Sequence, residues 1–315
     1  MAVLITGGLG SIGSRLASHL REKGYEVIVS DKAILKQDYY VRGDVTRYEE
    51  LAPIFKNYRI EHVFHFAGEV GRENGEQFPR RCIEINESGT INLAQLCLEY
   101  GARLYFASTS EIYGDLGDMK LTEDLADRMV LRPTNVYGWS KLHAEHYLQH
   151  FVKNYGLRAI SFRFFMCYGA GEYPDPYRSA MANFIYNVLR DEPITVHRGT
   201  YRSWCYIDDI VEACRLAMEK APDNDYQAYN IGRDDLRSME EIAELICELA
   251  GKPTSLINLT EPPKRLLTPV KNASFEKAYK AFGYKSKIPV EEGIRRTIEW
   301  QRQFVLKNNK ANLMK

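Results

Sequence analysis

The stretch that decides the fold is Ala2–Gly13, AVLITGGLGSIG, at the start of the chain. Its first five residues are apolar or β-branched and predict a buried strand. Apolar residues recur four apart over residues 11–23 and predict a helix directly after the glycines. The turn between strand and helix is made of Gly7, Gly10, Ser11, Ile12 and Gly13. Glycine allows a close approach to the backbone, and a helix N-terminus offers free N–H groups, so we expect this turn to hold a diphosphate.

Strands and helices continue to alternate through the first half of the chain. Strands are expected at residues 26–30, 62–67, 103–108 and 159–165, and helices at 48–57, 86–100 and 136–153. This alternation is typical of an α/β fold with a doubly wound parallel sheet that is covered on both faces.

The pattern changes after Cys167, where a Gly-, Pro- and Tyr-rich stretch predicts an irregular loop. Helices are expected beyond it at 178–190, 209–220, 238–250 and 290–304, with short strands at 194–197 and 228–231. Ser238 and Glu241 have the spacing of a capping box at the start of a helix. We therefore expect a dinucleotide-binding domain at 1–167, to which elements of the second half return. Residues 168–315 should mainly form a smaller, mixed α/β substrate lobe.

Composition excludes several classes of partner. Lys plus Arg and Asp plus Glu both total 42, so the net charge of zero argues against nucleic acid or a membrane surface as the partner. The six cysteines show no metal-ligand spacing and are expected to be buried free thiols, so no metal site is expected. The apolar start lacks a basic segment before it, and no apolar run is long enough to span a bilayer. We expect a cytoplasmic protein.

Asp31 closes the second expected strand and points to the choice of cofactor. A carboxylate at this place can accept hydrogen bonds from the adenosine ribose and would repel a 2′-phosphate. NAD is therefore favoured over NADP, although the positive charge of Lys32 weakens the exclusion of NADP. A reductase that uses NADP is disfavoured for the same reason.

Tyr137 and Lys141 form the expected catalytic pair. A spacing of four puts both on one helix face, where an ammonium and an oxidised nicotinamide would favour the phenolate. Such a phenolate can take the proton of a sugar hydroxyl. At the end of the 103–108 strand, Thr109 and Ser110 can bond the same substrate oxygen. Capping a helix or turn is the alternative role for these two hydroxyls.

Together these motifs resemble the extended short-chain dehydrogenase/reductase family, and more narrowly its nucleotide-sugar epimerase/dehydratase branch. The resemblance implies a Rossmann-type fold, NAD as cofactor and a nucleotide-diphosphate sugar as substrate. It adds cofactor contacts at Asp44, Val45, Phe66, Ala67 and Gly68, besides Tyr137 and Lys141 themselves. It also implies substrate contacts at Asn183, Arg202 and Arg265. Family members usually dimerise, here through the helices at 86–100 and 136–153.

The resemblance also implies transient oxidation of the sugar at C4, after which the 4-keto intermediate decides the product. C4 epimerisation is the first expectation. 4,6-Dehydration is an almost equal alternative to C4 epimerisation, because Glu111 could act as the base at C5. Ser110, however, stands where dTDP-glucose dehydratases carry Asp, and Arg72 could meet a charged sugar. Uronate decarboxylation, net C4 dehydrogenation and a non-enzymatic NAD-binding sensor or scaffold remain further alternatives.

Overall fold

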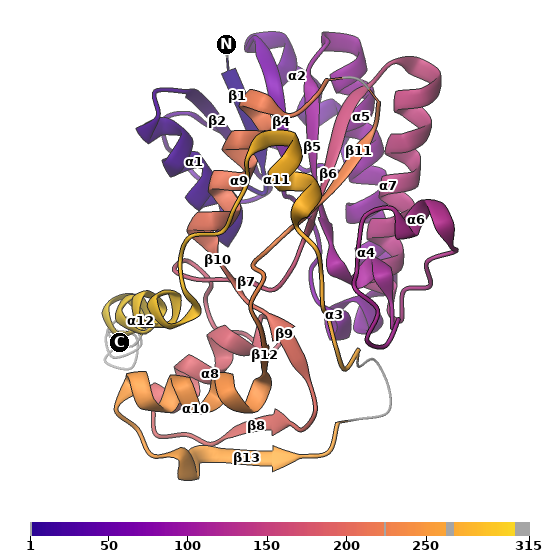
Figure 1. The fold of residues 1–315 in the computed structure, drawn as a ribbon. Coiled ribbons are helices and arrows are strands. Elements are labelled where there is room, and N and C mark those ends of the chain that lie inside the picture. The colour runs from indigo at the N-terminus through magenta and orange to yellow at the C-terminus, as the bar shows by residue number, and fades with distance from the viewer. Residues whose placement is uncertain (1, 224, 263–267, 306–315) are drawn as a thin grey trace.

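The computed structural model describes residues 2–223, 225–262 and 268–305. Its centre is a seven-stranded sheet in the order β11-β6-β5-β4-β1-β2-β3, in which every neighbouring pair is parallel. The strands are β1 (Ala2–Thr6), β2 (Glu26–Asp31), β3 (Tyr40–Arg42), β4 (Ile60–His65), β5 (Arg103–Thr109), β6 (Arg158–Phe164) and β11 (Gln227–Ile231). The expected doubly wound parallel sheet is confirmed, and Figure 1 shows it in the upper part of the molecule.

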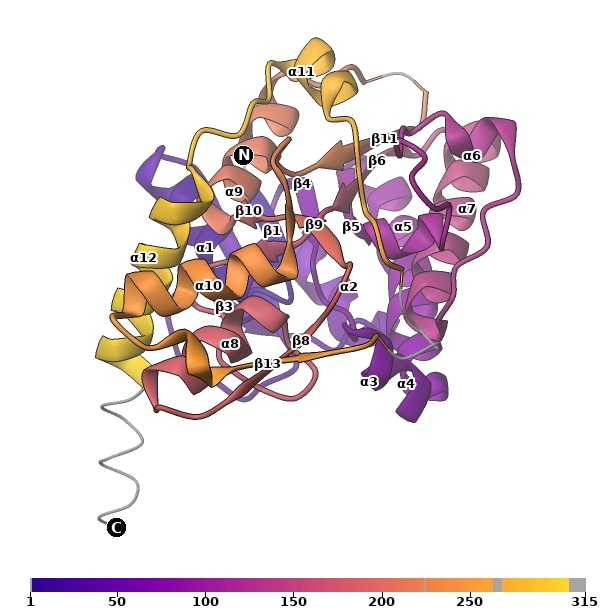
Figure 2. The same cartoon turned by 60° about the horizontal axis from the view of Figure 1, so that its bottom comes forward.

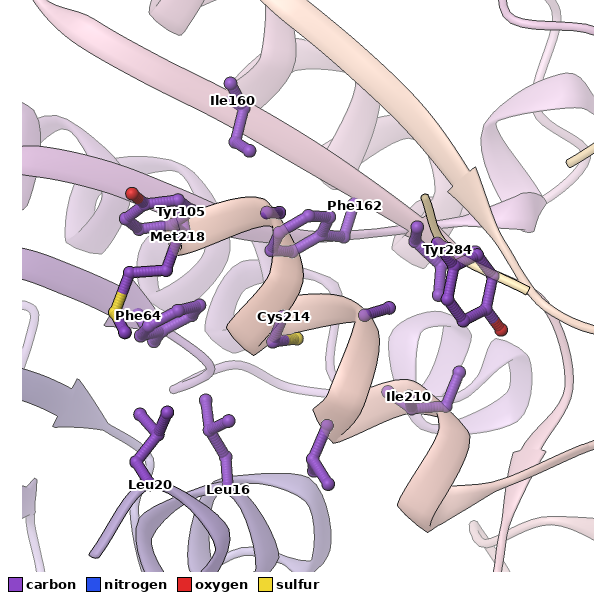
Figure 3. Packing of buried hydrophobic residues seen from close by; sticks show 14 of the residues in the cluster. Leu16, Leu20, Phe64, Tyr105, Ile160, Phe162, Ile210, Cys214, Met218 and Tyr284 are labelled. Atoms are coloured by element: carbon purple, nitrogen blue, oxygen red, sulfur yellow. The ribbon is translucent and has the colours of Figure 1, made fainter. Parts of the chain in front are cut away.

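Two helical layers cover the sheet because its strands are apolar on both faces. On one face lie α1 (Ser11–Glu22), α9 (Ile207–Lys220) and α11 (Glu276–Phe282). On the other lie α2 (Tyr48–Asn57), α5 (Gly89–Tyr100) and α7 (Val136–Tyr155). Side chains of β1 alternate between them, since Val3 and Ile5 enter the first layer and Leu4 enters the second. Figure 3 shows how Leu16 of α1 and Cys214 of α9 pack toward the aromatic rings of the sheet.

Two elements from the second half complete this domain. Strand β11 pairs with β6 at the edge of the sheet, and α9 packs against α1. The strand expected at 228–231 therefore belongs to the large sheet. The chain order reverses between β1 and β4, since β2 and β3 extend one way and β5, β6 and β11 the other. Ligands of open parallel sheets bind outside the carboxyl ends of the strands at such a reversal.

A smaller lobe lies below those carboxyl ends (Figures 1 and 2). Its short strand pairs are β8 (Ile194–His197) with β13 (Ile257–Thr260), β9 (Tyr201–Ser203) with β12 (Leu236–Ser238), and β7 (Cys167–Tyr168) with β10 (Cys205–Tyr206). Its helices α8 (Ala180–Leu189), α10 (Met239–Ala250) and α12 (Val290–Trp300) share a core with β8 and the buried Trp204. The capping box of Ser238 and Glu241 is confirmed at the start of α10.

Further short elements surround the site or close the chain. They are α3 (Arg72–Gln77), α4 (Pro79–Ile83), the π-helical turn η1 (Glu84–Ser88), the 3-10 turn η2 (Ser110–Tyr113), α6 (Leu125–Arg128), η3 (Thr254–Leu256) and η4 (Gln301–Val305). The helix expected at 86–100 thus starts inside η1 and continues as α5. No helix within the described part of the chain is both long and apolar enough to cross a bilayer.

Candidate active site

The glycine turn after β1 is shaped for a close ligand. Gly7 has φ +67°, and a Cβ there would lie 2.4 Å from the backbone N of Ala67. A Cβ on Gly13 would lie 2.4 Å from the carbonyl O of Gly7. Helix α1 begins at Ser11, and its N-cap Gly10 has no side chain to cap it, so the first N–H groups of the helix face the turn. A dinucleotide diphosphate fits this cradle.

The turn forms one end of a cleft of about 830 Å³ between the sheet and the smaller lobe. Every residue expected to contact the cofactor lies on its wall: Gly7, Gly10, Ser11, Ile12, Gly13, Asp31, Lys32, Asp44, Val45, Phe66, Ala67, Gly68, Tyr137 and Lys141. The structure thus gathers into one groove residues that the sequence scatters over five segments.

Asp31 faces the glycine turn from the end of β2. Its carboxylate accepts hydrogen bonds from the backbone N of Leu9 at 3.2 Å and of Lys32 at 2.8 Å. The turn and the carboxylate therefore hold each other in place at the expected adenosine ribose.

Replacing Asp31 with asparagine should weaken NAD binding by roughly tenfold or more, because a hydrogen bond to a charged group is worth about 1.5–3 kcal/mol. NADP binding should weaken far less, since the repelling charge is gone. Titration of both dinucleotides measures the ratio. Asp38→Asn, in the exposed loop after β2, is the matched control and should leave both affinities unchanged. An unchanged NAD-to-NADP ratio in Asp31→Asn would contradict this assignment.

The expected catalytic side chains lie at the floor of the cleft. Tyr137 is 8% exposed and Lys141 is 3% exposed, and both come from α7. Burial raises the pKa of the Tyr137 phenol, and a hydrogen bond with Thr109 acts in the opposite direction. Burial lowers the pKa of Lys141 to about 8. Lys141 is not among the groups that shift the Tyr137 pKa most. The rise in pKa caused by burial is therefore larger than the lowering expected from the ammonium of Lys141.

Asn86 organises this floor, although the sequence did not single it out. Its amide donates to Ser140 Oγ at 2.9 Å and to the carbonyl O of Glu69 at 3.0 Å, and it accepts from the N of Glu69 at 3.0 Å. It thereby ties the segment after β4 to α7. A Cβ on Gly68 would lie 2.9 Å from Asn86 Oδ1 and 3.1 Å from Lys141 Nζ, so only glycine leaves the lysine its place.

A cluster of polar side chains surrounds Glu111, which also lines the cleft. Arg72 donates from Nε to Glu111 Oε2 at 2.8 Å and from Nη2 to Oε1 at 3.0 Å. Asn135 donates to Oε2 at 3.0 Å, and the ammonium of Lys271 donates to Oε1. These cations hold the pKa of Glu111 well below its usual range, although burial acts against them.

Lys271 also belongs to this cluster, although no sequence pattern marks it as a site residue. It is 1% exposed, and its Nζ also lies 3.2 Å from Ser110 Oγ. Burial lowers its pKa to about 7, while Glu111 acts to raise it. Asn135 carried a usable signal, because it is the N-cap of α7 and accepts from the N of Gly138 at 2.8 Å.

The expected substrate contacts divide into three cases. Arg202 lies on the cleft wall, 6% exposed, and donates to the carbonyl groups of Thr268 and Pro269 at 2.7 and 2.8 Å. Burial, with the nearby charge of Arg72, lowers its pKa to about 10. Arg265 lies outside the described residues.

Asn183 departs from the expectation. The described residues that line the cleft do not include it. Its amide instead donates to the carbonyl O of Asp175 at 2.9 Å and accepts from the N of Asp175 at 3.1 Å. Asn183 therefore fastens the loop before α8, and the loop itself reaches the cleft through Glu172 and Tyr177.

Comparison with known proteins places these features in a family. Residues 3–232 match the model of the NAD dependent epimerase/dehydratase family. UDP-glucuronate 4-epimerase 1 of Arabidopsis thaliana is 26% identical over 100% of this chain and 80% of its own length. The UDP-glucose 4-epimerase of Thermotoga maritima, solved with UDP-glucose, superposes with a TM-score of 0.87 at 29% identity, covering 97% of this chain and 100% of that one. The UDP-glucose 4-epimerase of Thermus thermophilus, solved with NAD, superposes with a TM-score of 0.85 at 30% identity, covering 96% of this chain and 100% of that one.

Relatives that carry out the alternative reactions match as well, namely a dTDP-D-glucose 4,6-dehydratase and UDP-glucuronic acid decarboxylases. Their presence agrees with a common oxidation step and leaves the product to the residues around the sugar. The matched model spans the glycine turn, Asp31, Thr109 and the Tyr137–Lys141 pair. The chain is an NAD-dependent enzyme and belongs to the NAD-dependent epimerase/dehydratase family.

Proposed function

We propose that this enzyme epimerises a nucleotide-diphosphate hexose at C4. The observation that carries the choice of epimerisation is the state of Glu111. A carboxylate has about four lone-pair positions, and four donors from Arg72, Asn135 and Lys271 point at this one. A carboxylate so engaged is a poor base, which supports epimerisation over 4,6-dehydration.

The glycine cradle and Asp31 fit NAD, which supplies a hydride acceptor at C4 and the donor for the return. Tyr137 takes the proton of the C4 hydroxyl as the hydride leaves the same carbon. Thr109 forms a hydrogen bond with the phenol and so positions it for that oxygen. Burial raises the pKa of the phenol, so the ammonium of Lys141 and the charge of a bound oxidised nicotinamide would act together to favour the phenolate.

The smaller lobe holds the nucleotide in this proposal. Arg202 extends into the cleft with part of its guanidinium fixed on backbone carbonyl groups, so it can meet a diphosphate without losing its position. Phe184, Thr195, His197 and Met239 line the cleft from the smaller lobe, where the base would lie.

The test is a panel of UDP-, GDP-, CDP- and dTDP-glucose, GDP-mannose and UDP-glucuronate, with products read by mass and NMR. The proposal predicts a product of unchanged mass with inverted configuration at C4. Loss of water would indicate the dehydratase, and loss of carbon dioxide the decarboxylase. Release of NADH with a stable 4-keto product would indicate a net dehydrogenase.

The pH dependence of turnover should depend on Lys141. Its pKa is lowered to about 8, so the ammonium is present below that pH and lost above it. We expect kcat/KM to fall on an alkaline limb near pH 8. Lys141→Arg keeps its charge at all accessible pH values, so this limb should disappear in the variant. The same alkaline limb in both proteins would assign it to another group.

We further propose a cytoplasmic homodimer. All six cysteines are free, and five of them are buried, which suits a reducing compartment. Trp139 and Tyr147 of α7 and Tyr100 of α5 are 38–40% exposed on helices that pack side by side. Aromatic side chains of this kind are common in the core of protein interfaces. Light scattering at micromolar concentration should give twice the chain mass, and a monomer would contradict the proposal.

A further inference from the structure

Arg72 covers Glu111 from the side of the cleft. Both residues line the cleft, with side chains 21% and 11% exposed. The arginine starts the short helix α3 directly after Gly71, whose φ of +102° turns the chain. Its guanidinium then meets the carboxylate in a fork, one N–H on each oxygen. This geometry fixes direction as well as distance.

The other two donors reach Glu111 from behind. Lys271 is buried under the carboxylate at 1% exposure, and Asn135 is buried at the N-cap of α7. They occupy one lone-pair position on each oxygen. Arg72 lines the cleft, whereas Lys271 and Asn135 are not among the described residues that line it, so the two lone-pair positions that Arg72 occupies are those on the side of the cleft.

The chemistry of a 4-keto sugar makes this position important. The keto group acidifies the proton at C5. If a base takes that proton, the electrons of the C5–H bond form an enolate across C4 and C5. The C5–C6 double bond then forms as the C6–O bond breaks, and the leaving hydroxide gains a proton to become water. The hydride taken from C4 returns to C6 and C5 regains a proton, which gives a product one water lighter than the substrate. A carboxylate can start this elimination only with a lone pair that points at C5.

We propose that Arg72 determines the product of this enzyme by blocking Glu111 as the base at C5. The inference rests on the proposed C4 epimerisation, since it concerns the fate of the 4-keto intermediate. Arg72 is a specificity-determining residue that acts through Glu111. Without it, Glu111 keeps the charge of Lys271 behind it, remains ionised, and gains two lone pairs toward the sugar.

The experiment compares wild-type enzyme with Arg72→Met, Arg72→Lys and the double variant Arg72→Met/Glu111→Gln in D₂O. The substrates are the six nucleotide sugars of the panel, and deuterium at C5 is counted per turnover by NMR and mass. Wild type should give the C4 epimer without deuterium at C5. Arg72→Met should incorporate deuterium at C5 on the order of tenfold or more above the wild-type background, since each pKa unit gained by Glu111 is a tenfold change in proton affinity. It should also release a product one water lighter from the glucose or mannose substrates.

The two remaining variants separate the causes. Arg72→Lys replaces the fork with a single ammonium, so its C5 deuterium should lie between wild type and Arg72→Met. The double variant should lose the C5 exchange, because Glu111 is the group that Arg72 restrains. Melting curves of all four proteins verify that the folded enzyme is being compared.

Two outcomes would overturn the inference and leave epimerisation standing. One is C5 deuterium in the wild-type epimer, and the other is an Arg72→Met enzyme that inverts C4 without C5 exchange. The wild-type measurement needs no variant and so does not depend on folding. If wild type inverts C4 in none of the six sugars, the proposed function itself fails, and the inference falls with it.

Discussion

Replacing Tyr137 with phenylalanine should lower kcat by about a thousandfold, because positioned general acid–base groups contribute roughly 10²–10⁴-fold to rate. The phenol is the only hydroxyl that this change removes, and it is the group that would exchange a proton with the C4 oxygen. NAD affinity should stay near the wild-type value, since the glycine turn and Asp31 are untouched. Steady-state turnover and dinucleotide titration measure the two effects separately.

Tyr155→Phe is the control for this change. It lies at the end of the same helix, 63% exposed, and should leave both kcat and NAD affinity unchanged. A Tyr137→Phe enzyme that keeps wild-type turnover would contradict the catalytic assignment, and it is the result that an NAD-binding sensor predicts.

Removing the carboxylate of Glu145 should cost about 3–5 kcal/mol of unfolding free energy, the usual range when one partner of a buried ion pair is lost. Glu145 and Arg163 form a pair with side chains 1% and 2% exposed. The guanidinium donates from Nε at 3.1 Å and from Nη2 at 2.8 Å, and Ser108 donates to the same carboxylate. In Glu145→Leu the charge of Arg163 would be buried without its anion. Chemical denaturation near neutral pH measures the loss.

The double variant Glu145→Leu/Arg163→Met should recover part of that stability, because it removes the uncompensated charge as well. Glu276→Ala is the control, since its ion pair with Lys280 has side chains 66% and 70% exposed. It should leave the unfolding free energy nearly unchanged. If Glu145→Leu were as mild as this control, the buried pair would not stabilise the sheet beneath the catalytic floor.

The expected cofactor contacts could be chosen from the sequence because their signals are local. A strand, a glycine turn and a helix are adjacent in the chain, and a parallel sheet brings Asp31, Phe66 and Thr109 to the same edge. The position of β11 at the edge of the large sheet is harder to predict from the sequence. Its pattern predicts a strand, but only its pairing with β6 shows which sheet it joins.

The sugar end was harder because its contacts are distant in sequence. Lys271 follows Glu111 by 160 residues and meets it only after the chain has built the smaller lobe and returned. An isolated lysine in an irregular segment has no pattern that marks it as buried. The sequence motifs indicate Arg72 and Glu111 separately, but not that they pair. An unpaired Glu111 would be a candidate base, whereas one held by Arg72 and Lys271 is not. Asn183 is the opposite case, a residue that was expected to contact the substrate. Its side chain is bonded to the loop before α8 instead, and no sequence pattern indicates that contact.

The most direct test of C4 oxidation with internal return uses a nucleotide sugar from the panel that carries deuterium at C4. The account predicts a C4-inverted product of unchanged mass that retains the deuterium at C4, with no label released into NADH in solution. Deuterium recovered at C6 of a product one water lighter, or lost from the sugar altogether, would contradict it.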